Sequence, residues 1–311
     1  MIYSTDRILT AHAGSLPRPD DLREMVLAKA RGEPIDQATL DARLKSAVAE
    51  IVKRQVACGL DVVNDGELSK PNFTDYVSAR IAMPVCVDKL RYVGQAELAR
   101  DLDNFKAALA GVTVAEAFLP ANTPGTIEHW MGNEYYDSDE AFLFAIAEAM
   151  REEYNAIVDA GFLLQIDDPD LPDGWACLPK ITVPEYRKYA ALRIDALNHA
   201  LRDIPREKVR LHVCWGSFHG PHHDDIPLKD IIDLIFRVRA GSGHCTDFIE
   251  HPDLLAERLV RYAELVGREN VLAGTDCGLG TRVGHPSICW AKFEAMAEGA
   301  RRATKILWGR A

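Results

Sequence analysis

The stretch that decides the fold is FLLQIDDPD at residues 162–170, an apolar run that ends in carboxylates. A short apolar run closed by polar residues and a proline is typical of a buried parallel strand. The same form recurs along the chain, in ILTAHAGS at 8–15, LDVVNDGE at 60–67, VAEAFLPAN at 114–122, VRLHVCWG at 209–216 and VLAGTDCG at 271–278. Each run therefore predicts a strand that presents polar side chains at its carboxyl end.

Amphipathic segments separate these runs and carry apolar residues at helical spacing, at 38–58, 139–160, 185–201 and 254–266. Strands that alternate with such segments indicate parallel strands joined by crossover helices. We therefore predict fold class α/β, a (β/α)8 TIM barrel, as a single domain over residues 1–311. The strand ends that would surround its pocket are Ser15, Glu67, Pro120, Asp167, Cys214 and Cys277.

The spacing of the strand ends indicates that segments are missing near residues 82–84 and 239–243. A complete barrel has eight strands, and only six strand ends are recognisable. The last interval, of about 60 residues, would have to hold three strand-helix steps of roughly 25 to 30 residues each. The helical stretch at 227–239 also runs directly into GSGHC, with no strand between them.

The composition excludes several classes of partner. The 311 residues carry a formal net charge of −11, whereas nucleic acids and anionic membranes attract basic surfaces. No apolar stretch approaches the roughly 18 residues that suggest a membrane span. We therefore expect a cytoplasmic protein with reduced cysteines that acts on small molecules and binds neither nucleic acid nor membrane. The sequence does not indicate the oligomeric state.

A His-x-Cys pair marks one strand end as a candidate metal site. His212 and Cys214 lie two residues apart, so both side chains face the same side of a strand. Cys277 ends the last strand and can converge on them in a closed barrel. Three ligands of this type, with one position left open, are typical of catalytic zinc. The alternative is that these cysteines are small buried hydrophobes, and the residues alone leave it open.

Five segments in this order carry a resemblance to a known family: TAHAGSLPRP, DVVNDGE, QIDDP, LHVCWG and AGTDCGLGTR. Together they resemble the catalytic barrel of cobalamin-independent methionine synthases and their single-barrel relatives, which include epoxyalkane:coenzyme M transferase. The resemblance implies that His212, Cys214 and Cys277 bind Zn²⁺. Methionine synthases of this family also use a glutamate on the following strand. That glutamate has no counterpart here, so the fourth ligand stays open.

The resemblance also implies roles for residues at the other strand ends. Glu67 and Asp167 correspond to carboxylates that hold the amino group of an amino-acid thiol. Gly14 and Ser15 correspond to the backbone that receives its carboxylate. His244 is the candidate catalytic residue, as the general acid that protonates the leaving group. The alternatives are helix caps or strand-end hydrogen bonds for the acids and an ordinary loop position for His244.

The function expected from these features is that of a zinc-dependent S-methyltransferase, which transfers a methyl group to a zinc-bound thiol such as homocysteine, as in methionine biosynthesis. The chain has no room for the second half that helps methionine synthase to bind a polyglutamated folate. A methylated folate and a corrinoid carrier therefore both stay open as methyl donors. Two alternatives remain, an epoxide:thiol transferase of the coenzyme M type and a non-catalytic zinc-binding or substrate-binding barrel protein.

Overall fold

The computed structural model describes residues 2–71, 85–178, 180–215, 225–235, 237–238, 240–241, 249–275, 277–280 and 285–309. The chain divides into two compact units. Unit 1 consists of Met1–Pro71, Asp103–Phe118 and Gly243–Ala311, and unit 2 of Asn72–Leu102 and Leu119–Ser242. The single domain expected over residues 1–311 stays a prediction.

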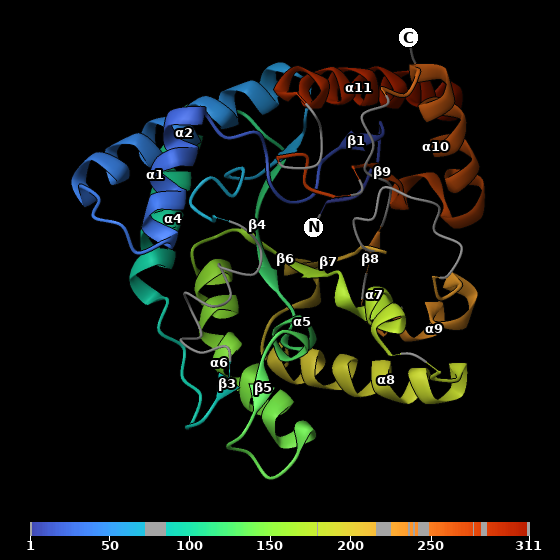
Figure 1. The fold of residues 1–311 in the computed structure, drawn as a ribbon. Coiled ribbons are helices and arrows are strands. Elements are labelled where there is room, and N and C mark those ends of the chain that lie inside the picture. Colours follow the sequence, from blue (N-terminus) through green and yellow to red (C-terminus); the bar gives the residue numbers. More distant parts are fainter. Residues whose placement is uncertain are drawn as a thin grey trace. The chain divides into compact units, whose positions relative to one another are not determined.

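Unit 1 contains short parallel strands. β1 (Leu9–Thr10) pairs with β9 (Leu272–Ala273), and β2 (Val62–Val63) pairs with the first residues of β4 (Glu116–Asn122). Its helices are α1 (Asp20–Ala30), α2 (Gln37–Ala57), α10 (Pro252–Val266) and α11 (Pro286–Trp308). The last two helices pack against each other (Figure 1).

Local sequence signals explain where the helices of unit 1 begin and end. The Asp36 side chain accepts a hydrogen bond from the Ala38 amide at the start of α2, and Gly59, with a φ of 87°, follows its end. The helix α11 begins with a proline in its first turn and ends at Gly309 in the left-handed conformation. These helices bury their apolar faces, including Leu44 and Phe293.

Unit 2 contains most of a five-stranded sheet in the order β2-β4-β6-β7-β8. The strand β4 runs into unit 2 and is followed there by β6 (Leu163–Asp168), β7 (Val209–Val213) and β8 (Ala240–Gly241). The helices are α5 (Pro124–His129), α6 (Asp139–Asp159), α7 (Asp170–Cys177), α8 (Val183–Ala200) and α9 (Ile232–Ile235). A separate parallel ribbon joins β3 (Val85–Cys86) to β5 (Gly132–Asn133), and α4 (Gln95–Leu109) has residues in both units.

The register of the sheet in unit 2 aligns three polar side chains. Asp167 on β6 pairs with His212 on β7. The Thr123 amide donates to the Asp167 carbonyl over 3.3 Å, which brings Asn122, the last residue of β4, level with Asp167. Residues that lie level on adjacent parallel strands point to the same face. Asn122, Asp167 and His212 therefore form one row across three neighbouring strands.

The helices predicted at 38–58, 139–160, 185–201 and 254–266 are present, each within two residues of the expected ends. Two expectations near residue 239 were wrong. Among its described residues, the stretch at 227–239 forms a 3-10 turn (Leu228–Asp230) and the four-residue α9 instead of one helix, and β8 lies where no strand was expected. A two-residue strand has no sequence periodicity and depends on its pairing with β7. The expected break at 82–84 lies outside the described residues.

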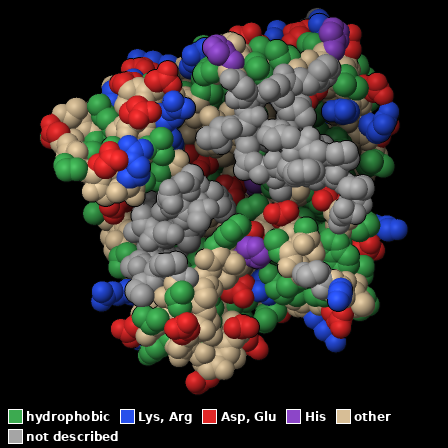
Figure 2. Space-filling model, viewed as in Figure 1, with side chains coloured by type: hydrophobic (Ala, Val, Ile, Leu, Met, Phe, Trp, Pro, Cys, Tyr) green, Lys and Arg blue, Asp and Glu red, His purple; other side chains and the backbone are tan. Residues whose placement is uncertain are grey.

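Surface charge and helix hydropathy agree with the composition. Among the described helices, none combines the length and the apolar character needed to cross a membrane. On the described part of the face in Figure 2, Lys and Arg side chains are interspersed with Asp and Glu and do not gather into one basic patch.

Candidate metal centre

His212 and Cys214 are positioned by β7. The strand alternates Val209, Leu211 and Val213, which are buried, with Arg210 and His212, so His212 lies on the face opposite to these apolar residues. Cys214 directly follows the strand. Both side chains are buried, at 8% and 7% exposure. Beyond the strand, the indole N–H of Trp215 donates to the carbonyl of Ile226 over 3.0 Å and holds the chain as it leaves β7.

Cys277 lies in a segment that follows β9 and packs backbone to backbone against residues 13–16. The Ala13 amide donates to the Thr275 hydroxyl over 3.1 Å, and the Gly280 amide donates to the Ser15 carbonyl over 2.9 Å. A β-carbon at Gly278 would lie 2.4 Å from the Ser15 amide nitrogen, so only glycine fits there. This close approach fixes the backbone next to the half-buried Cys277.

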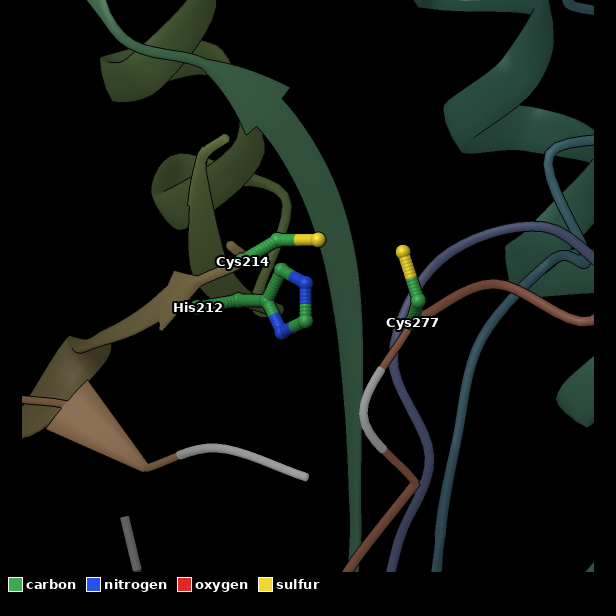
Figure 3. A group of neighbouring side chains, drawn as sticks. All are labelled: His212, Cys214 and Cys277. Atoms are coloured by element: carbon green, nitrogen blue, oxygen red, sulfur yellow. The ribbon is translucent and has the colours of Figure 1, made fainter. Parts of the chain in front are cut away.

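The ligand atoms of His212, Cys214 and Cys277 lie within 4.8 Å of one another. Figure 3 shows the imidazole ring and the two sulfur atoms pointing toward a common space. One imidazole nitrogen and two thiol sulfurs form a donor set that suits zinc, and three protein ligands leave a coordination position open. The donor set thus fits the predicted Zn²⁺.

The residue level with His212 on the next strand is Gly241, which has no side chain to offer. The fourth ligand that the family's methionine synthases draw from the strand after His-x-Cys therefore has no counterpart at this position of β8. The fourth ligand stays open within the described residues.

Asp167 is held by a neighbour on its own strand. Gln165, two residues earlier and on the same face, donates from Nε2 to Asp167 Oδ1 over 2.7 Å. The next residue, Asp168, points to the opposite face, where its Oδ1 accepts a hydrogen bond from the Leu171 amide. Burial, and next the charge of Asp170, raises the pKa of Asp168 to about 7. Only Asp167 therefore shares the face of His212.

Glu67, Gly14 and Ser15 come together in unit 1. Glu67 has a φ of 53°, and its Oε2 lies 3.8 Å from Lys70 Nζ. A β-carbon at Gly14, whose φ is 62°, would lie 3.3 Å from Glu67 Oε1. Ser15 follows and contacts Gly278. The structure thus places these three residues side by side.

His244 lies outside the described residues, so its role stays a prediction. Gln165 and Asn122 were not identified from the sequence as site residues, although the two-residue spacing between Gln165 and Asp167 could have indicated the first. Arg18 was also missed. Its guanidinium donates to the carbonyls of Glu67 and Leu68 and supports the turn that carries Glu67.

The family and the relatives that this chain resembles agree with one another. Residues 8–234 match the family model described as cobalamin-independent synthase, catalytic domain. A methionine synthase from Thermococcus kodakarensis is 23% identical over 323 aligned residues, which cover 93% of this chain and 91% of that protein. A methionine synthase from Sulfolobus acidocaldarius is 26% identical over 307 residues, covering 87% and 85%.

Solved structures show the same fold. A B12-independent methionine synthase from Shewanella sp. W3-18-1, solved in complex with selenomethionine, matches with a TM-score of 0.75 at 18% identity and covers 98% of this chain and 100% of that one. A putative vitamin-B12 independent methionine synthase from Listeria monocytogenes matches with a TM-score of 0.73 at 16% identity, covering 96% and 99%. The α/β fold class predicted from the sequence, the (β/α)8 TIM barrel, is thereby confirmed.

Proposed function

Because the chain belongs to the family of cobalamin-independent synthase catalytic domains, we propose that it is a zinc-dependent methyltransferase whose methyl acceptor is a thiol such as homocysteine. The observation that carries this proposal is the convergence of one imidazole and two thiols, from His212, Cys214 and Cys277, within 4.8 Å. The methionine synthases that it resembles over about nine-tenths of its length support the choice of reaction.

The nucleophile would be the substrate thiol in its thiolate form. When bound, zinc(II) lowers the pKa of a substrate thiol, so that the thiolate is present at neutral pH. His212, Cys214 and Cys277 would hold the ion and leave one position for the substrate. Because both His212 and Cys214 are nearly buried, water has little access to this part of the site.

The remaining site residues would orient the thiol. A buried ammonium needs anionic partners, and we assign this role to Asp167 in unit 2 and Glu67 in unit 1. The hydrogen bond from Gln165 keeps the Asp167 carboxylate turned in one direction. We assign the substrate carboxylate to the backbone at Gly14 and Ser15. Proton delivery to the leaving group is assigned to His244, and a cytoplasmic location stays a prediction.

The direct test is a substrate screen with the full zinc-loaded chain. Homocysteine and coenzyme M would each be paired with methyltetrahydrofolate, methylcobalamin and a short epoxide. We expect S-methylation of homocysteine by one of the two methyl donors, and loss of this activity in Cys214→Ser but not in Cys58→Ser. Alkylation of coenzyme M by the epoxide alone would identify the chain as an epoxide:thiol transferase. Bound zinc without any transfer would favour a non-catalytic zinc-binding protein.

A further inference from the structure

Two buried amide side chains next to Asp167 have polar atoms without a partner. Asn122 is 4% exposed and Gln165 is fully buried, yet Asn122 Nδ2 and Gln165 Oε1 make no hydrogen bond to any residue that the structure describes. Buried polar groups in native proteins are nearly always paired, and exceptions occur at sites that receive a ligand. Both residues belong to unit 2.

The strand register places both amides on the face of the candidate metal ligand His212. Gln165 is two residues before Asp167 on β6, so the two side chains share a face. Asn122 lies level with Asp167 on β4, and His212 lies level with it on β7. Asp167 is therefore in the middle of the row, with His212 on one side and Asn122 on the other.

The hydrogen bonds within the fold determine which side-chain atom of each amide remains available to a ligand. Gln165 donates from Nε2 to Asp167, so its Oε1 remains as an acceptor beside that carboxylate. The Asn122 backbone is held by the hydroxyl of Tyr154 on α6, which donates to its carbonyl. Its buried side-chain atom without a partner is the donor Nδ2. The Asp167 carboxylate thus has a hydrogen-bond acceptor, Gln165 Oε1, next to it. A donor, Asn122 Nδ2, lies on the side of Asp167 that faces away from His212.

This arrangement complements one chemical group, a zwitterionic amino acid. We propose that Asn122 Nδ2 donates to a carboxylate oxygen of an amino-acid thiol, and that Gln165 Oε1 accepts from its ammonium beside Asp167. This assignment rests on the proposed function, because it assumes that the thiol sulfur lies on the side of His212. A thiol without an ammonium would leave Gln165 Oε1 unpaired, and a thiol without a carboxylate would leave Asn122 Nδ2 unpaired. Asn122 and Gln165 are therefore specificity-determining residues that select α-amino acid thiols.

Binding measurements with three thiols, two of which each lack one charged group of homocysteine, would separate the role of Asn122 from that of Gln165. Homocysteine carries both charged groups, 4-mercaptobutanoate lacks the ammonium, and 3-aminopropane-1-thiol lacks the carboxylate. Their dissociation constants would be measured by titration calorimetry on the zinc-loaded full chain, in the unchanged protein and in Asn122→Ala, Gln165→Ala and Asn155→Ala. Asn155 is the matched control, since its amide on α6 donates to the Arg151 carbonyl.

We expect Asn122→Ala to weaken the binding of homocysteine and 4-mercaptobutanoate by about 10- to 100-fold, which is the range for a lost hydrogen bond to a charged group. The affinity for 3-aminopropane-1-thiol should stay nearly unchanged. Gln165→Ala should weaken the binding of the two amine-bearing thiols and leave the affinity for 4-mercaptobutanoate nearly unchanged. Asn155→Ala should bind all three as the unchanged protein does. Because Nδ2 of Asn122 has no hydrogen-bond partner among the described residues, Asn122→Ala should not lower the melting temperature, whereas a merely structural role would.

The inference is overturned if Asn122→Ala weakens the binding of all three thiols equally, or of none of them, while the unchanged protein binds homocysteine. It is also overturned if Asn122→Asp tightens 3-aminopropane-1-thiol, since position 122 would then face the ammonium. Failure of the unchanged zinc-loaded protein to bind any of the three thiols contradicts the proposed function itself. The two failures are thus distinguishable.

Discussion

Gly278 and Ser15 approach each other so closely that a β-carbon at position 278 would lie 2.4 Å from the Ser15 amide nitrogen and 2.7 Å from its hydroxyl oxygen. Gly278 follows the candidate ligand Cys277 directly, and Ser15 belongs to the backbone assigned to the substrate carboxylate. This single close approach joins two parts of unit 1 that are far apart in the sequence.

Gly278→Ala should therefore damage both stability and the candidate site. The added methyl group has no space, so we expect the free energy of unfolding to fall by about 1 to 3 kcal/mol, the range for overpacking. Zinc affinity should fall as well, because the backbone at Cys277 must move. Urea denaturation and zinc titration measure the two effects. Gly274→Ala is the control, since the nearest atom to its β-carbon lies 4.0 Å away. Equal behaviour of the two variants would contradict this account.

Glu67 keeps a left-handed backbone, with a φ of 53°, that glycine adopts more readily. We expect Glu67→Gly to weaken the binding of amine-bearing thiols about tenfold or more, because an anionic partner of the ammonium is lost. Its free energy of unfolding should change by less than about 1 kcal/mol, since relief of backbone strain offsets the loss of the Lys70 contact.

The matched control for Glu67 is the exposed Lys180, the other described non-glycine residue with a positive φ, at 73°. Lys180→Gly should leave thiol affinity unchanged and should stabilise the fold by up to about 1 kcal/mol. Unchanged affinity for amine-bearing thiols in Glu67→Gly would remove Glu67 from the substrate site.

The raised pKa of Asp168 predicts that the free energy of unfolding depends on pH. Burial raises its pKa from the ordinary 3.8 to about 7, so the folded protein holds this proton more tightly than the unfolded chain does. The stabilising contribution is complete below about pH 4 and is lost as the pH rises toward 7, with a slope of up to about 1.4 kcal/mol per pH unit.

The variant Asp168→Asn keeps an oxygen for the Leu171 amide and carries no charge. Its free energy of unfolding should therefore fall less between pH 4 and pH 7 than that of the unchanged protein, and should be higher at pH 8. Urea denaturation at several pH values measures both slopes. Parallel slopes in the two proteins would show that Asp168 is not the group responsible.

The sequence predicted those parts of the fold that rest on local patterns. The helix α6 begins at Asp139 as expected, because Ser138 caps it through the Ala141 amide. The apolar run before Asp167 predicted β6, since a buried parallel strand needs continuous apolar residues. The two-residue spacing of His212 and Cys214 likewise predicted that both side chains face the same side, and the structure brings their ligand atoms together at the end of β7.

Other features depend on pairings between distant segments, which local patterns do not encode. The strand β8 has only two residues and exists through its pairing with β7. Asn122 comes level with Asp167 only because the Thr123 amide bonds to the Asp167 carbonyl, and no sequence spacing predicts that register. The need for glycine at 278 likewise follows from the position of Ser15, more than 260 residues earlier in the chain.

The most direct test of the central claim is the zinc content of the purified chain and of three single variants, measured by atomic absorption after dialysis. We predict about one zinc per chain in the unchanged protein and in Cys58→Ser, whose buried thiol has a raised pKa and joins no group of metal-ligating side chains in the part of the chain that the structure describes. Cys214→Ser and Cys277→Ser should each lose most of the metal. Full zinc retention in Cys277→Ser would contradict the claim that these three residues bind one ion.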